Sequence, residues 1–131
     1  MVEKTNVTKW PIEDVPDEDD LYYRIHKEFF EEDTTIIPSA SFRPQGNSMS
    51  TDWNKYSTPE KLNQRAKNPE DNRVVEMNVG DVRIIPLTIN HAPDYVEMNR
   101  AHTDVLGLIG LPKSKMSKIR TQLAALSSWV I

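Results

Sequence analysis

The sequence predicts an α+β domain built on a small, mostly antiparallel sheet or a partly open barrel. Two observations lead to this fold class: short runs of β-branched residues bounded by turn residues, and a C-terminal stretch whose apolar residues recur with a helical period. A chain of 131 residues, 37% of them hydrophobic, has the size of one domain with a real core. We expect an acidic, irregular N-terminal arm over residues 1–20 and a single globular domain over residues 21–131.

The first half of the chain carries few regular elements. Residues 21–30 begin with strand formers and end with helix formers, which leaves both a short strand and a helix open. Residues 34–58 are rich in Ser, Thr, Asn and Pro and predict a long loop, with short strands near residues 35–37 and around Phe42. A loop of this length is uncommon in a small domain and is often mobile or functional.

A short capped helix is predicted over residues 59–67. Pro59 suits the first helical position, and Ser57 or Thr58 before it can accept a hydrogen bond from a first-turn N–H. Pro69 disfavours the helical conformation for the residue before it, so the helix should end there.

Residues 73–77 and 82–89 predict an antiparallel hairpin. Both runs are rich in β-branched residues, and the sequence Asn-Val-Gly-Asp at residues 78–81 is typical of a turn. Both faces of the second run are apolar, which indicates a central strand, although Pro86 removes one backbone donor there. Another strand is expected within residues 101–108.

An amphipathic helix is predicted over residues 114–128, because apolar residues recur there every three or four positions and Lys115, Lys118 and Gln122 lie opposite them. Residues 129–131 are apolar, and we expect them to pack against the body or a partner. The residues expected in the core are Ile25, Phe42, Val75, Val82, Ile85, Leu87, Ile89, Val105, Ile119, Leu123, Leu126 and Trp129.

Composition excludes several classes of protein. Without cysteine the chain has no disulfide framework, no thiolate metal site and no cysteine nucleophile. No apolar run reaches the roughly 20 residues of a membrane helix, and the N-terminus is acidic where a signal peptide would be apolar. These patterns predict a cytoplasmic protein without a membrane span. No motif requires a cofactor.

Charge is distributed unevenly along the chain. Residues 1–35 carry a net charge of −7 and residues 36–131 a net charge of +3, so the total of −4 hides a basic body. The acidic arm could cover a basic surface and compete with an anionic ligand, or it could be a solvated tail. A pI of about 5.4 argues against extended nucleic acid as a partner, whereas the basic body allows an anionic small molecule or a nucleotide.

Histidines and arginines are the candidates for acid–base chemistry. His91 and His102 stand at the two ends of a predicted loop and could meet as a catalytic pair. Arg43 and Arg83 would contact the anion and stabilise developing charge. If a metal is bound, its candidate ligands are His26, His91 and His102; no metal-ligand spacing is present, and each histidine could instead bond a backbone carbonyl.

The predicted loop also concentrates ligand-binding groups. Ser48 and Ser50 could contact a phosphate through their hydroxyls, and Trp53 or Tyr56 could stack on a base. The spacing of phosphate-binding loops is absent, so no nucleoside triphosphate site is predicted. Trp53 and Tyr56 could equally be core residues.

Two functions from different classes are consistent with these patterns. The first is a domain with a polar pocket between residues 39–56 and 91–102, which binds an anionic or nucleotide-like ligand and acts as a phosphoester-directed hydrolase or transferase. The second is a non-enzymatic interaction module, either an accessory subunit or a homo- or hetero-oligomer, which uses the apolar C-terminus and the acidic arm as contacts. Whether the protein is an enzyme is left open by the sequence.

Overall fold

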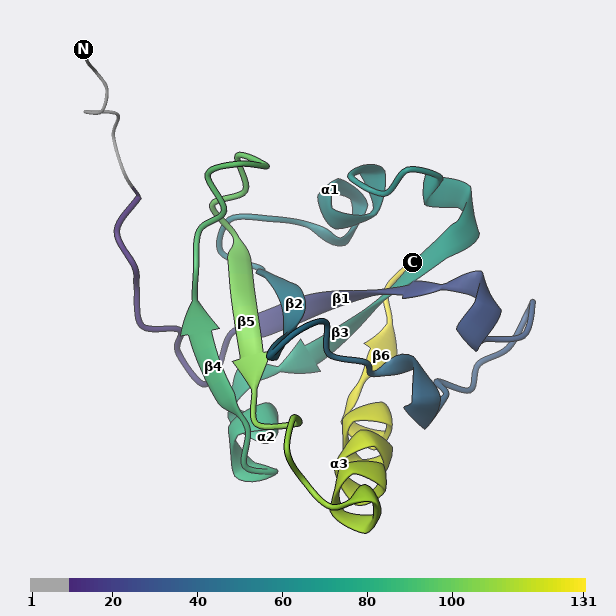
Figure 1. Cartoon of the computed structure of the whole chain (residues 1–131). Helices are drawn as coiled ribbons and strands as arrows, with labels where there is room; N and C mark the ends of the chain where they lie inside the picture. Colours follow the sequence, from purple (N-terminus) through teal and green to yellow (C-terminus); the bar gives the residue numbers. More distant parts are fainter. Residues whose placement is uncertain (1–9) are drawn as a thin grey trace.

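The computed structural model describes residues 10–131 and confirms an α+β fold on an open antiparallel sheet (Figure 1). The strand order is β4-β5-β2-β1-β3-β6, and every neighbouring pair is antiparallel. The strands are β1 (Asp20–His26), β2 (Ser48–Trp53), β3 (Asn72–Asn78), β4 (Thr88–His91), β5 (His102–Leu106) and β6 (Ser128–Trp129). The helices are α1 (Pro59–Gln64), α2 (Val79–Ile84) and α3 (Lys113–Leu126), with 3-10 turns η2 (Lys27–Phe29), η3 (Ser39–Ser41) and η4 (Pro69–Asp71).

One face of the sheet carries the core. Alternate residues of each strand point to this face, and α3 and η3 pack on its β3 side, with Leu123 of α3 fully buried. Figure 1 shows α3 on one side of β1 and β3 and α1 on the other. The buried side chains of the strands on this face are Leu21, Tyr23, Ile25, Met49, Trp53, Val75, Met77, Ile89 and Val105.

The opposite face is covered over only part of its width. α1 packs against β1 and β3, where Leu62 of the helix and Val74 of β3 are both buried. Over β2 and β5 the same face carries polar residues, because the register pairs Asp52 with His102. The sequence therefore places an uncovered polar surface beside a short helix.

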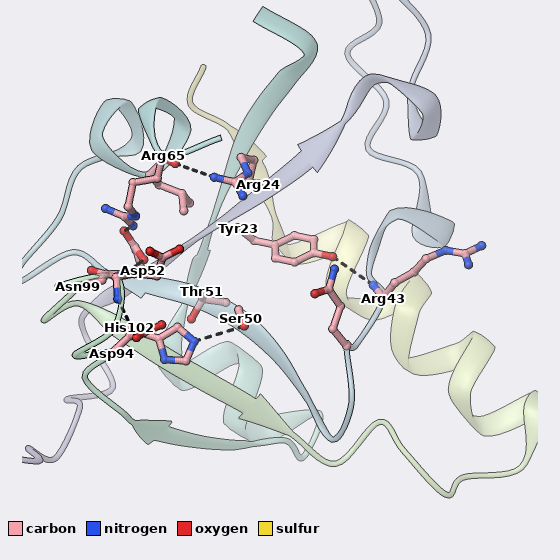
Figure 2. Close-up of a pocket in the computed structure, with 13 residues that line it drawn as sticks. Tyr23, Arg24, Arg43, Ser50, Thr51, Asp52, Arg65, Asp94, Asn99 and His102 are labelled. Carbon is pink, nitrogen blue, oxygen red and sulfur yellow. Dashed lines mark hydrogen bonds and ion pairs between the residues drawn. The ribbon is translucent and has the colours of Figure 1, made fainter. Parts of the chain in front are cut away.

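The sheet is split between β1 and β2. These strands pair only at Leu21 with Trp53 and at Tyr22 with Asp52, although β1 pairs along its whole length with β3 and β2 pairs with β5 over nearly all of its own. Beyond the two shared pairs the strands diverge, as Figure 2 shows, and each presents an unpaired edge to the other. The opening between these edges contains the candidate site.

The hairpin predicted from residues 73–89 is wrong. β3 pairs with β1 and β6, and the chain leaves it directly into α2 rather than into a second strand. The cause is Asn78, whose side-chain oxygen accepts a hydrogen bond from the N–H of Asp81 and caps α2. Val79 and Val82, one helical turn apart, are then both buried.

The predicted loop over residues 34–58 contains a strand that the prediction missed. β2 lies there between β5 and β1, so a segment whose Ser and Asp residues interrupt its strand formers is held by long-range pairing. Residues 35–37 and Phe42 are not strands; Phe42 follows η3 and is fully buried.

The remaining elements follow the predictions more closely. Residues 21–30 divide into β1 and η2, α1 ends at Gln64 instead of residue 67, and β5 lies within the range expected for it. α3 covers residues 113–126 rather than 114–128, and Trp129 belongs to β6, where it pairs with Val75. Of the expected core, Ile85, Ile119, Leu126 and Trp129 are only partly buried and pack against its surface.

The described part of the predicted N-terminal arm lies along the body, beside β4 (Figure 1). The N–H of Glu13 donates to Nδ1 of His91, and Trp10 stacks on Tyr95 with 5.1 Å between ring centroids. Val15 is buried in the core. Residues 1–9, and the part of the arm prediction that concerns them, lie outside the described residues.

Candidate functional site

A polar cavity of about 330 Å³ lies at the split between β1 and β2 (Figure 2). It is bordered by β1, β2, α1 and the turn that leads into β5, so residues far apart in the sequence meet in it. The lining residues are Tyr23, Arg24, Arg43, Gln45, Ser50, Thr51, Asp52, Leu62, Arg65, Asp94, Glu97, Asn99 and His102.

Asp52 is a buried carboxylate at the centre of this cavity, with 2% of its surface exposed. One carboxylate oxygen accepts hydrogen bonds from the hydroxyl of Ser57, at 2.7 Å, and from the guanidinium of Arg65. The other oxygen accepts from the side-chain amide of Asn99 at 2.9 Å. A buried charge needs this degree of hydrogen bonding to be tolerated. Asp52 thereby ties β2 to α1 and to the turn before β5.

Arg24 brings a second guanidinium to the same wall. Its Nη1 donates to the carbonyl of Leu62 at 2.9 Å, the single hydrogen bond of its guanidinium among residues 10–131. Burial lowers the pKa of Arg24, and the nearby positive charge of Arg65 lowers this pKa further, while Asp52 opposes the shift. Two guanidiniums therefore share one carboxylate, and Arg24 retains unused N–H donors beside the cavity.

His102 is held in one tautomer on the opposite wall. Its Nδ1 lies 2.7 Å from the carbonyl oxygen of Ala92, which can only accept, so Nδ1 carries the proton. In the neutral imidazole Nε2 is then unprotonated, and it faces the hydroxyl of Ser50 at 3.3 Å (Figure 2). Asp104 is also close, with 3.6 Å between its Oδ1 and Nε2. This arrangement gives the cavity a basic nitrogen in a fixed orientation.

A tight turn between Asp94 and Asn99 forms the rim of the cavity. The backbone N–H groups of Val96 and Glu97 donate to the Asp94 carboxylate, and Asp94 and Asn99 exchange two backbone hydrogen bonds. Met98 has φ of +53° at this turn. The turn thus fixes Asn99 where its amide reaches Asp52.

Three of the eight residues proposed from the sequence line this cavity: His102, Ser50 and Arg43. Arg43 does so without directing its charge inward, since its Nε donates to the carbonyl of Ala40 and its guanidinium lies 5.0 Å above the ring of Phe29. Figure 2 shows this guanidinium pointing away from the cavity.

His91 lies on the other face of the sheet, in the register of Thr103 rather than of His102. Both of its ring nitrogens are engaged, Nδ1 by the N–H of Glu13 at 3.0 Å and Nε2 by the carbonyl of Arg100 at 2.7 Å. The structure therefore does not bring His91 and His102 together as a pair.

The other four proposed binding residues do not line the cavity. Trp53 is buried and donates to Asp19, and Tyr56 stacks beside His91. Ser48 donates to Asp104 at 3.1 Å, and Arg83, on α2, pairs with Asp17 at 2.6 Å. The side chains of these four residues are engaged with other parts of the fold, outside the cavity.

The three histidines proposed as metal ligands are not gathered into one site. His26, at the far end of β1, caps η2 by accepting from the N–H of Glu28. Across the described part of the chain, no group of three or more His, Asp or Glu side chains is arranged to hold a metal ion.

Arg24, Asp52, Arg65 and Asn99 are site residues that the sequence reasoning missed. Arg24 lies between two buried apolar residues of β1, so the alternation of the strand could have indicated that its side chain lies on the polar face. Asp52 carried no such signal, because the strand that positions it reads as loop.

Comparison of the chain with family models, with curated proteins and with solved structures gave no match. Among residues 10–131, the longest helix, α3, is too short and too polar to cross a lipid bilayer, and the same holds for the others. The site must therefore be interpreted from its own geometry.

Proposed function

We propose that the cavity binds a small anionic ligand through a phosphate group, and that the protein acts on it as a phosphoester-directed hydrolase or transferase. The observation that carries the proposal is the pair of guanidiniums, Arg24 and Arg65, beside the buried carboxylate of Asp52. A phosphate would accept hydrogen bonds from the unused N–H donors of Arg24 and pair with its charge. Orientation of Arg65 by Asp52 would lower the entropy cost of binding.

The size of the cavity limits the ligand. A volume of about 330 Å³ is at the lower end of the range for small-molecule sites, which favours a phosphomonoester or a single nucleotide over extended nucleic acid. Asp94 and Glu97 at the rim bring negative charge of their own, so the site favours one phosphate over a polyphosphate.

His102 supplies the chemistry in this proposal. Its unprotonated Nε2 can take a proton from an attacking hydroxyl, while a guanidinium stabilises the charge that develops on the phosphoryl group. These roles need a base and a cation in one cavity, and His102 and Arg24 both line this one (Figure 2).

Calorimetry with inorganic phosphate and with adenosine monophosphate tests the binding step. Arg24→Met removes the donors but keeps an apolar stem to cover Leu62, and we expect it to weaken binding at least about tenfold, since a charged hydrogen bond contributes on the order of 1.5–3 kcal/mol. Arg83→Met is the matched control, because this arginine lies outside the cavity. Equal affinities of the two variants, or no binding to the wild-type protein, would refute the proposal.

The interaction module gains no specific support. Val130 and Ile131 donate to the carbonyl of Val74, so the apolar C-terminus predicted as a partner contact is paired with β3. The cytoplasmic location stays a prediction from the sequence.

A further inference from the structure

We infer that Ser50 is the nucleophile of this site, and that the reaction passes through a covalent phosphoserine. The inference rests on the proposed function of the same cavity. It starts from the hydroxyl of Ser50, which is exposed, lines the cavity and lies 3.3 Å from Nε2 of His102. This is the arrangement by which a base activates a serine hydroxyl.

The backbone of Ala92 completes the arrangement. Its carbonyl accepts the Nδ1 proton of His102 at 2.7 Å and so leaves the lone pair of Nε2 for the hydroxyl of Ser50. A third group that fixes the tautomer of the base is the usual companion of an activated serine, and here a main-chain oxygen takes that place. Ala92 is a positioning residue, because it acts only through the imidazole.

The strand register explains why Ser50, rather than Ser48, is the candidate. Both serines lie on the same face of β2, two residues apart, but they meet different partners on β5. The hydroxyl of Ser48 donates a hydrogen bond to the carboxylate of Asp104 at 3.1 Å, and Ser48 does not line the cavity. Among the described residues, the hydroxyl of Ser50 has His102 as its one hydrogen-bond partner.

The chemistry balances without any further reagent. The Oγ of Ser50 attacks phosphorus as its proton passes to Nε2 of His102. The bond from phosphorus to the leaving oxygen, which lies opposite Oγ, breaks, and that oxygen takes a proton from solvent. Water then attacks the phosphoserine from the opposite side and loses its proton to solvent, the bond from phosphorus to Oγ breaks, and Oγ takes its proton back from the imidazolium of His102, which releases inorganic phosphate and free Ser50. A second alcohol in place of water would make the protein a transferase.

Mass spectrometry of protein quenched during turnover of p-nitrophenyl phosphate tests the inference. We expect the wild-type protein to gain one phosphoryl group and peptide mapping to locate it on Ser50. Ser48→Ala should label normally, whereas Ser50→Ala and His102→Ala should not label. Turnover by Ser50→Ala should fall about a thousandfold or more, the size of loss seen when the nucleophile is removed from a set of catalytic residues that act together.

The outcomes separate this inference from the proposed function. If phosphate binds but the wild-type protein never carries a phosphoryl group, or carries it elsewhere than on Ser50, the nucleophile is refuted while the binding site stands. If phosphate does not bind at all, the proposed function itself fails. Mapping on the wild-type protein requires no variant to fold, and Ser50 is an exposed residue whose replacement leaves no cavity in the core.

Discussion

Asp52 shows how a single residue organises the site. Its carboxylate is satisfied by donors from three segments of the chain, and each donor is thereby held at the edge of the cavity. A buried ion pair of this kind contributes little net stability compared with an apolar pair, but removal of one partner leaves the other charge uncompensated. Asp52 therefore has a structural role, in which its charge compensates the guanidinium of Arg65.

Replacement of Asp52 by Asn should reveal that role. The new side chain has nearly the same shape but no charge, so Arg65 loses its ion pair. Because a third of the Arg65 side chain is exposed to solvent, which screens its charge, we expect the free energy of unfolding to fall by roughly 3 kcal/mol, the lower end of the range for a broken buried pair. Urea denaturation measures it. Asp17→Asn, in the exposed pair with Arg83, is the control and should change stability by less than about 0.5 kcal/mol. Equal effects would contradict this role for Asp52.

At the residue scale, chemical type was a partial guide to the site. His102 and Ser50 could be selected because few side chains act as base or nucleophile, and both line the cavity. His91 is chemically identical to His102, and only the strand register, which the sequence does not reveal, places it on the other face. Arg24 and Arg65 could not be selected by chemical type, because arginines are common on protein surfaces.

At the scale of elements, the carboxylate of Glu13 joins the N-terminal segment to several groups of the body. Glu13 contacts three cationic or phenolic groups: Lys55 at 2.5 Å, Arg100 at 3.7 Å, and the hydroxyl of Tyr56. Hydrogen bonds from Lys55, then from Tyr56, lower the pKa of Glu13 below its ordinary value of 4.5. The segment is therefore attached to the body by a group that requires its negative charge.

Attachment of this segment should depend on pH. Because the pKa of Glu13 is lower in the folded protein than in the unfolded chain, its stabilising contribution is complete above about pH 4.5 and is lost as the pH falls through the lowered value. The protection of residues 10–19 against hydrogen exchange, measured relative to the intrinsic exchange rate at each pH, should fall in that acidic range before the rest of the sheet opens. In Glu13→Gln the exchange should be faster already at neutral pH, and an unchanged acid-dependent step in this variant would contradict the role of Glu13.

Elements were predictable where local chemistry decides them. Thr58 and Pro59 predict α1, and its N-cap bond from the N–H of Lys61 is present at 3.1 Å. The β-branched run after Asn78 misled the prediction, because the Asn78 cap and the burial of Val79 and Val82 favour helix over strand propensity. The sequence pattern of one segment does not reveal which tertiary contacts its side chains will make.

At the scale of the whole molecule, the fold class was accessible from the sequence and the site was not. Recurring apolar positions predict a sheet with a terminal helix, and that is the architecture observed. The cavity arises from the divergence of β1 and β2, and β2 was not predicted at all. A site made by pairing strands incompletely has no signature within any one segment.

The order β4-β5-β2-β1-β3-β6 also governs how the chain reaches its native state. β2 pairs with β5, so that Thr51 and Thr103, 52 residues apart, must find each other before the centre of the sheet exists. Such distant contacts must overcome loop-closure entropy first, and we expect refolding in milliseconds to seconds, which stopped-flow fluorescence can time. Microsecond refolding would contradict this. Ser50, Asp52 and His102 meet through that same pairing, so phosphate binding should recover only as the slowest contacts form, and partly folded chains should be inactive.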